Sequence, residues 1–112
     1  MVEMQPSELA KLIKRSQVAH PSRLAIMLIL VFRRRVQFTE LQHTLDMTPG
    51  NLWSHIEKLE AQGYVKRKRM LVPFRYVTVV EATEKGVRET LKLLEALSNF
   101  TSMLQKVEEE GS

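Results

Sequence analysis

The sequence predicts a mainly α-helical domain with one small β-hairpin, an α+β fold in the order α-α-β-α-α-β-β-α. Two observations carry this prediction. Apolar residues recur at helical spacing over most of the 112 residues, whereas the only paired strand candidates lie at 64–70 and 74–80. No internal repeat or linker divides the chain, so we expect one domain, 1–112. Residues that favour a helix start precede the helical segments, namely Ser7, Thr39, Thr48 and Thr83.

The first part of the chain is expected to form two helices. One runs from its N-cap, Ser7, to about Ser16. The other opens at His20-Pro21-Ser22, because proline fits the first turn of a helix, and continues to the basic run 33–35. Its apolar stretch, 24–32, has nine residues, whereas a membrane span needs roughly 20. We therefore expect a buried helix and no membrane partner.

The rest of the chain predicts a pair of short helices, a hairpin and a long helix. Thr48 followed by Pro49 begins the second short helix, and Gly63 fits a left-handed cap at its end. A short extended piece at 36–38 precedes the pair. The expected bounds of the remaining elements are 39–45 and 48–62 for the helix pair, 64–70 and 74–80 for the strands, and 83–109 for the last helix.

The distribution of charge indicates which part of the chain would meet a polyanion. The formal net charge is +4. Residues 33–75 hold nine basic and four acidic residues, whereas residues 76–112 hold four basic and seven acidic ones. The middle of the chain is therefore basic and its end is acidic.

No cysteine is present, which excludes disulfides and thiolate metal ligands. The start of the chain lacks the pattern of a signal peptide, so we expect a cytoplasmic protein.

Two helices joined by a tight turn and followed by a basic hairpin predict a winged helix-turn-helix. In the second helix, Leu52, Ile56 and Leu59 recur at core spacing, so the opposite face is expected to be exposed. A capped helix with such a face suits the major groove of double-stranded DNA. Amide, hydroxyl and indole side chains can each contact base edges. The expected base-reading residues are Asn51, Trp53 and Ser54.

The hairpin and the ends of the recognition helix supply the expected contacts to the DNA backbone. Residues 66–69 form the densest basic run, and alternation along a strand puts at most two of the four on one face. A solvated edge strand is the alternative interpretation of this run. For residues 33–35, the helix dipole and phosphate contact are equally good explanations. The expected backbone contacts are Thr48, Gly50, Lys58, Lys66, Arg67, Lys68, Arg69 and Arg75.

Three stretches of the sequence resemble ArsR-type and MarR-type winged-helix regulators. Residues 20–30 resemble the opening helix of ArsR-type proteins, residues 47–65 look like the shared recognition helix and first wing strand, and residues 82–86 are similar to the start of the dimerising C-terminal helix. The resemblance implies a dimeric, DNA-binding transcription regulator of prokaryotic type. The wing tip, 70–74, is apolar where the family usually has glycine and arginine, so tip insertion into a minor groove does not follow from the resemblance. A cysteine-based effector site does not follow either, and no small-molecule effector is assigned.

The last helix predicts a homodimer. Its apolar residues form a heptad seam of the kind that packs along another helix. A second row, at Val87, Leu91 and Leu94, is expected to cover the domain's own core. A fold-back of the helix on its own domain is the alternative. The expected interface residues are Leu93, Leu97, Phe100, Leu104 and Val107.

Catalytic and metal sites are not expected. His20, His43 and His55 lie on separate predicted helices without ligand spacing, and His55 is expected to be a hydrogen-bonded packing residue. No phosphate loop, cysteine nucleophile or serine elbow is present, so we expect no enzyme and no cofactor. A winged helix used only for protein assembly and a non-specific nucleic-acid-binding protein are the alternative functions.

Overall fold

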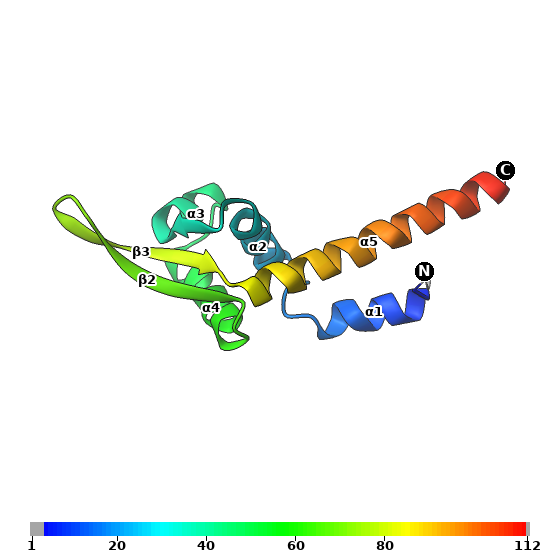
Figure 1. Cartoon of the computed structure of the whole chain (residues 1–112), viewed down its shortest axis with the longest axis horizontal. Coiled ribbons are helices and arrows are strands. Elements are labelled where there is room, and N and C mark those ends of the chain that lie inside the picture. Colours follow the sequence, from blue (N-terminus) through cyan, green and yellow to red (C-terminus); the bar gives the residue numbers. More distant parts are fainter. Residues whose placement is uncertain (1–3, 112) are drawn as a thin grey trace.

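The computed structural model describes residues 4–111 and has the predicted mainly helical winged-helix topology (Figure 1). The strands form one antiparallel sheet in the order β1-β3-β2. The hairpin extends from one end of the molecule and the last helix from the other (Figure 1), giving extents of 63 × 25 × 23 Å. The elements are α1 Pro6–Arg15, α2 Pro21–Arg33, β1 Arg35–Gln37, α3 Phe38–Thr44, α4 Pro49–Ala61, β2 Val65–Val72, β3 Arg75–Ala82 and α5 Glu84–Gly111.

Three of the expected helix starts are confirmed by their hydrogen bonds. The His20 Nδ1 atom accepts from the Ser22 backbone N–H at 3.1 Å. The Thr48 hydroxyl accepts from the backbone N–H of Asn51 at 3.2 Å, and the Thr83 hydroxyl accepts from that of Gly86 at 3.0 Å. Each side chain thus satisfies one of the N–H groups that a helix start leaves unpaired.

Two expected caps are wrong. Ser7 lies inside α1, which begins at Pro6 after its N-cap Gln5, because proline at the first position fixes the start two residues earlier than expected. Thr39 lies inside α3, because β1 pairs with β3 through Gln37 and the helix follows it directly. The helix α2 is also shorter than expected. It ends at Arg33, and Arg34 adopts φ 70°, which turns the chain into β1.

The core lies where the helix pair, α2 and the sheet meet. The inward positions expected for α4, Leu52, Ile56 and Leu59, are fully buried. They pack with apolar side chains of the neighbouring elements, which holds α4 with its opposite face outward. The fully buried partners from these elements are Ile26, Met27, Leu30, Leu41, Val65 and Val80.

The hairpin is longer than expected. Leu71 and Val72, expected in the connection, instead belong to β2 and pair with Tyr76 and Arg75 of β3. A tight turn at Pro73-Phe74 joins the strands, and Phe74 has φ 71°. β2 and β3 therefore pair along their whole length and carry the turn well beyond the core (Figure 1).

The first half of helix α5 packs on the core with the face predicted for the dimer. Leu93 is buried and Leu97 is partly buried against the same core, so Leu93 is not available to a partner chain. Gly86 and Thr90 are buried on this face, whereas Leu91 of the second row is 49% exposed. The expected interface is therefore wrong for Leu93, while the second row is confirmed at Val87, which packs against the core, and wrong at Leu91. Small residues on the face of Leu93 allow α5 to approach the core closely. A count of apolar residues along the sequence does not detect such a face.

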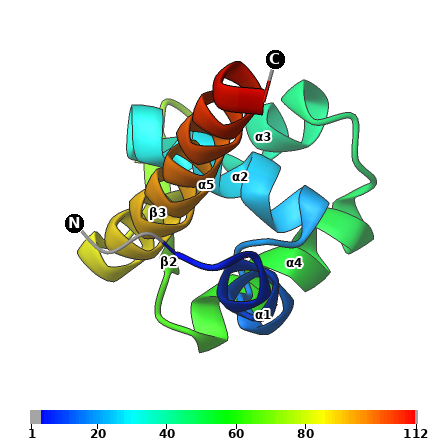
Figure 2. The same cartoon turned by 90° about the vertical axis from the view of Figure 1, so that its right-hand side faces the viewer.

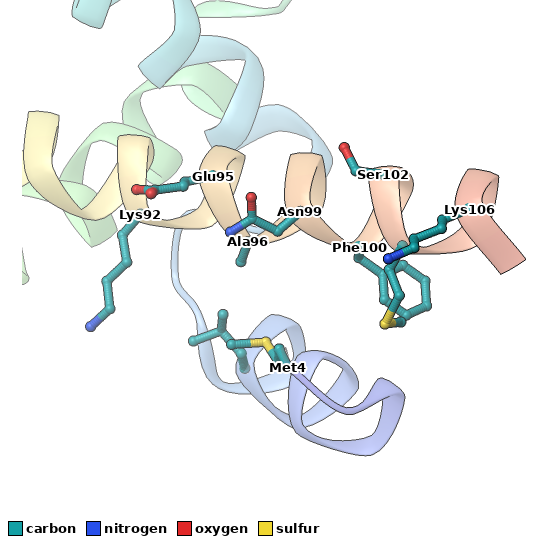
Figure 3. Close-up of a pocket in the computed structure, with 10 residues that line it drawn as sticks. Met4, Lys92, Glu95, Ala96, Asn99, Phe100, Ser102 and Lys106 are labelled. Carbon is teal, nitrogen blue, oxygen red and sulfur yellow. The ribbon is translucent and has the colours of Figure 1, made fainter. Parts of the chain in front are cut away.

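The first helix lies beside the middle of α5 (Figures 1 and 2). Leu9 of α1 is buried. An open groove of about 530 Å³ remains between the two helices. Figure 3 shows Met4 from the α1 side and Phe100 from α5 directed into it. Its lining also includes Leu12 and Met103, so the groove is largely apolar.

Candidate nucleic-acid interface

The outward face of α4 carries the polar side chains expected to read bases. Asn51, Ser54, Glu57 and Lys58 are exposed. Gly50 is also exposed, and a Cβ atom built there would meet nothing within 4 Å. The first turn of α4 can therefore approach another surface closely. This turn is capped by Thr48 and carries the positive end of the helix dipole.

Trp53 is less exposed than expected. Its ring contacts Phe38 edge to face, with centroids 5.2 Å apart, and the Arg67 guanidinium lies 4.5 Å from its centroid. The side chain is consequently half-buried. Helical spacing places Trp53 off the inward face correctly, but Phe38 and Arg67 come from other elements and cover it. Part of the side chain stays exposed, and we call this part the open edge of Trp53.

Arg67 is held by the protein itself. Its Nε atom donates to Glu60 Oε2 at 2.9 Å, and its Nη2 atom lies 2.7 Å from Glu60 Oε1. The hydrogen bond to Glu60 raises the pKa of Arg67 above its ordinary value. Together with the contact to Trp53, this bidentate pair joins the base of β2 to α4. We call these three residues, Trp53, Glu60 and Arg67, the helix–wing brace. Sequence reasoning assigned Arg67 to phosphate and missed the brace.

The other basic residues of the hairpin divide between its two faces, as strand alternation predicts. Lys68 pairs with Glu81 at 3.0 Å, and this contact lowers the pKa of Glu81. Arg69 lies on the other face, 5.0 Å from the centroid of Tyr76. Lys66, Arg69 and Arg75 are exposed and form no ion pair within residues 4–111. Arg69 and Arg75 lie beyond the helix–wing brace toward the tip of the hairpin, whereas Lys66 lies on its core side, next to Arg67.

The basic run 33–35 is partly explained by internal contacts. Arg33 forms an ion pair with Glu40 at 2.6 Å, which links the end of α2 to α3. Arg34 supplies the positive φ that ends α2. Arg35 is exposed on the edge strand β1 and its Nη1 atom lies 4.0 Å from Met70 Sδ.

His55 is a packing residue, as expected. It is buried, and its Nδ1 atom lies 3.2 Å from Arg23 Nη1. A guanidinium can only donate, so Nδ1 accepts and the imidazole is neutral. Burial lowers the pKa of His55, and the nearby His20, Arg23 and Lys58 lower it further. In the part of the chain that the structure describes, no three potential ligand side chains are grouped to hold a metal.

Comparison with known proteins decides the family. Residues 22–101 match the family of winged helix DNA-binding domains. The chain belongs to this family. A solved structure of a transcriptional regulator homologue from Pyrococcus horikoshii OT3 is similar over 87% of this chain and 97% of that chain, with 41% identity and a TM-score of 0.80. The regulator-like winged helix expected from the sequence is therefore confirmed.

Other relatives match this winged helix domain at lower identity. The DNA-bound structure of reduced AbfR has a TM-score of 0.67 at 19% identity and covers 93% of this chain and 81% of that chain. An uncharacterized protein of Methanocaldococcus jannaschii is 34% identical over 57% of this chain and 70% of its own length. A riboflavin kinase of Pyrococcus abyssi is 36% identical over 56% of this chain, but the match spans only 28% of the kinase.

None of the helices within residues 4–111 has both the length and the hydropathy that a membrane crossing requires.

Proposed function

We propose that this winged helix domain is a non-enzymatic transcription regulator that binds specific sites on double-stranded DNA. One observation carries the proposal: the exposed polar face of α4 adjoins a hairpin whose outer part bears unpaired cations. In this arrangement α4 enters the major groove, where Asn51 and Ser54 read base edges and the open edge of Trp53 contacts a sugar or a thymine methyl group. The relative named as a kinase is matched over a small part of its length, so kinase activity is not transferred.

The phosphate contacts follow from which cations the protein leaves unpaired. Lys66, Arg69 and Arg75 on the hairpin and Lys58 on α4 form no ion pair within the described residues. Thr48 and Gly50 place the first turn of α4 against a phosphate. Arg67 and Lys68 are already paired with carboxylates, so we give them a smaller share than the sequence alone suggested.

We further propose a symmetric dimer through the second half of α5. Residues 98–111 extend past the core (Figure 1), and Leu104 and Val107 there are 51% and 59% exposed. A helical segment of this length is marginal in water without packing. These residues continue the face that Leu97 packs on the core, and Phe100 joins them to the groove beside α1 (Figure 3). A second copy would cover the stripe and place two recognition helices about 34 Å apart.

The test of DNA binding is a salt titration followed by base-preference measurements. Four unpaired cations per subunit, each releasing counterions with a log–log slope of about −0.9, predict a slope of magnitude above roughly 6 for a dimer. The variants Asn51→Ala and Ser54→Ala should lose about 1–3 kcal/mol of discrimination at the positions they read. The variants Lys66→Ala and Arg69→Ala should weaken all sequences equally. A slope near zero, or equal behaviour of both pairs of variants, would overturn the proposal.

The test of the dimer is sedimentation equilibrium at micromolar concentration. Leu104→Glu/Val107→Glu removes the exposed stripe without touching the core, and we expect this variant to be monomeric. Leu97 is left unchanged because it packs on the domain's own core. Leu91→Glu, which changes an exposed leucine off the stripe, is the matched control and should remain dimeric. A monomeric wild type, or a dimeric double variant, would exclude this interface.

A further inference from the structure

The tip of the hairpin exposes apolar side chains that the proposed contacts of α4 and the cations do not use. Phe74 is fully exposed and Leu71 is 68% exposed. Leu71 pairs across the strands with Tyr76, which is also exposed. Unpaired cations flank this apolar tip, Arg69 before it and Arg75 after it. The tip is therefore an apolar point within a positively charged hairpin.

The turn holds Phe74 outward in an unfavourable backbone conformation. Its φ of 71° lies in the left-handed region, which usually takes glycine or asparagine. Pro73 fixes its own φ near −65°, so the two residues have the φ signs of a type II turn. A large aromatic side chain at this turn position gains nothing from the fold, since it contacts solvent alone. Burial of the phenyl ring in a complex would offset this cost.

The length of the hairpin matches the spacing of the grooves of DNA. Arg67 contacts α4 through Trp53 and Glu60, and Val72 lies five residues further along β2. At 3.3–3.4 Å per residue the tip is about 17 Å from the brace. One DNA turn is about 34 Å, so a minor groove lies about half that distance from the centre of the adjacent major groove. With α4 in the major groove, a hairpin of this length is long enough to reach the next minor groove.

We propose that Phe74 and Leu71 form an apolar wedge that enters this minor groove and partly unstacks one base step. The inference rests on the proposed DNA binding by α4. Apolar side chains inserted from the minor groove can unstack and kink DNA, and pyrimidine–purine steps kink most easily. The wedge therefore adds sequence preference, for a flexible step about half a turn from the bases read by α4. The flanking Arg69 and Arg75 contact the phosphates on either side of the groove, which favours DNA over an apolar protein surface as the occupant.

The test uses a duplex selected from a random pool by the wild-type protein. 2-Aminopurine replaces the adenine of the pyrimidine–purine step half a turn from the α4 contact, and its fluorescence rises when the base unstacks. Binding of the wild type should raise the emission. Phe74→Ala should abolish the rise and weaken binding at least about tenfold, as expected for one phenylalanine side chain left in water, with the salt slope unchanged. Phe32→Ala removes another phenyl ring that is 89% exposed, and should behave as wild type.

A second variant separates the wedge from simple loss of contact. Phe74→Arg should give no rise in emission but should steepen the salt slope by about 0.9 per subunit, because it adds a phosphate contact. If Phe74→Ala binds as tightly as wild type and gives the same emission, the wedge is refuted and the tip becomes a surface for protein. If the wild type shows no salt-dependent binding to any duplex, the DNA-binding proposal itself fails. The two failures are therefore distinguishable.

Discussion

Replacing Arg67 by alanine separates a structural contact from a DNA contact on the same hairpin. Arg67 makes two close contacts to Glu60, at 2.9 and 2.7 Å, and lies 4.5 Å from the centroid of Trp53. Both side chains of the ion pair are about one third exposed, at 36% and 31%. The guanidinium is thus already committed to a carboxylate. We expect Arg67→Ala to loosen the wing against α4 and not to remove a phosphate contact.

The size of the effect follows from the two contacts. A partly exposed bidentate pair contributes about 1 kcal/mol after allowance for solvent screening. A cation–π contact at such a site adds about 0.5–1 kcal/mol. Arg67→Ala should therefore lower the free energy of unfolding by about 1–2 kcal/mol. The matched control is Lys66→Ala, one residue earlier on the same strand. It should change stability by less than about 0.5 kcal/mol but reduce the salt slope by about 0.9 per subunit.

Two measurements on the same variants provide the assay. Urea unfolding can be followed by fluorescence, since Trp53 is the single tryptophan and lies within the brace. A double-mutant cycle of Arg67→Ala with Glu60→Gln should return a coupling of at least about 0.5 kcal/mol. Salt titration of DNA binding gives the slope. The structural role of Arg67 is refuted if Arg67→Ala keeps wild-type stability and loses about 0.9 from the slope per subunit, as a phosphate contact would.

Three further predictions concern stability. Gly86→Ala should destabilise the fold by about 1–3 kcal/mol in urea, because its new Cβ would overlap the backbone carbonyl of Tyr64. The melting temperature should fall as the pH drops below about 6.5, because folding lowers the pKa of His55 and protonation therefore favours the unfolded state. His55→Asn should show a smaller fall. An equal fall would contradict this role of His55. Thr48→Ala should cost about 1 kcal/mol through loss of the cap, with Thr48→Ser near wild type by the same thermal assay.

The parts of the fold that sequence reasoning predicted correctly depend on local chemistry. Thr48 before Pro49 and Gly63 after α4 bound a helix whose inward residues recur at 3.6-residue spacing. These signals lie within a few residues of the feature that they determine. The error at Ser7 is also local, because Pro6 offers a competing start one residue away, whereas the error at Thr39 depends on a distant strand. Pairing of β1 in particular depends on β3, more than forty residues away.

The errors at the candidate interface have a different cause. The spacing of apolar residues in α4 correctly predicts that Trp53 lies off the inward face. The same spacing contains no information on which other elements cover that residue. Phe38 comes from α3 and Arg67 from β2. The pairing of Arg67 with Glu60 likewise joins a strand to a helix. A run of cations in a sequence therefore overstates the number available to DNA, because tertiary contacts with carboxylates cannot be counted along the chain.

The longest helix shows why apolar spacing alone cannot assign an interface. In α5 the seam through Leu93 and Leu97 is continuous with Leu104, so one heptad pattern covers two environments. The boundary between them is set by where the core ends. The residues that mark the core half are the small or polar Gly86 and Thr90, both buried, and Thr90 satisfies its hydroxyl on the Gly86 carbonyl at 2.8 Å. Close approach of α5 to the domain thus uses residues that a count of apolar positions omits. Beyond Leu97 the same face continues through Leu104 and Val107, which are exposed, and this is the part that the proposed dimer would bury.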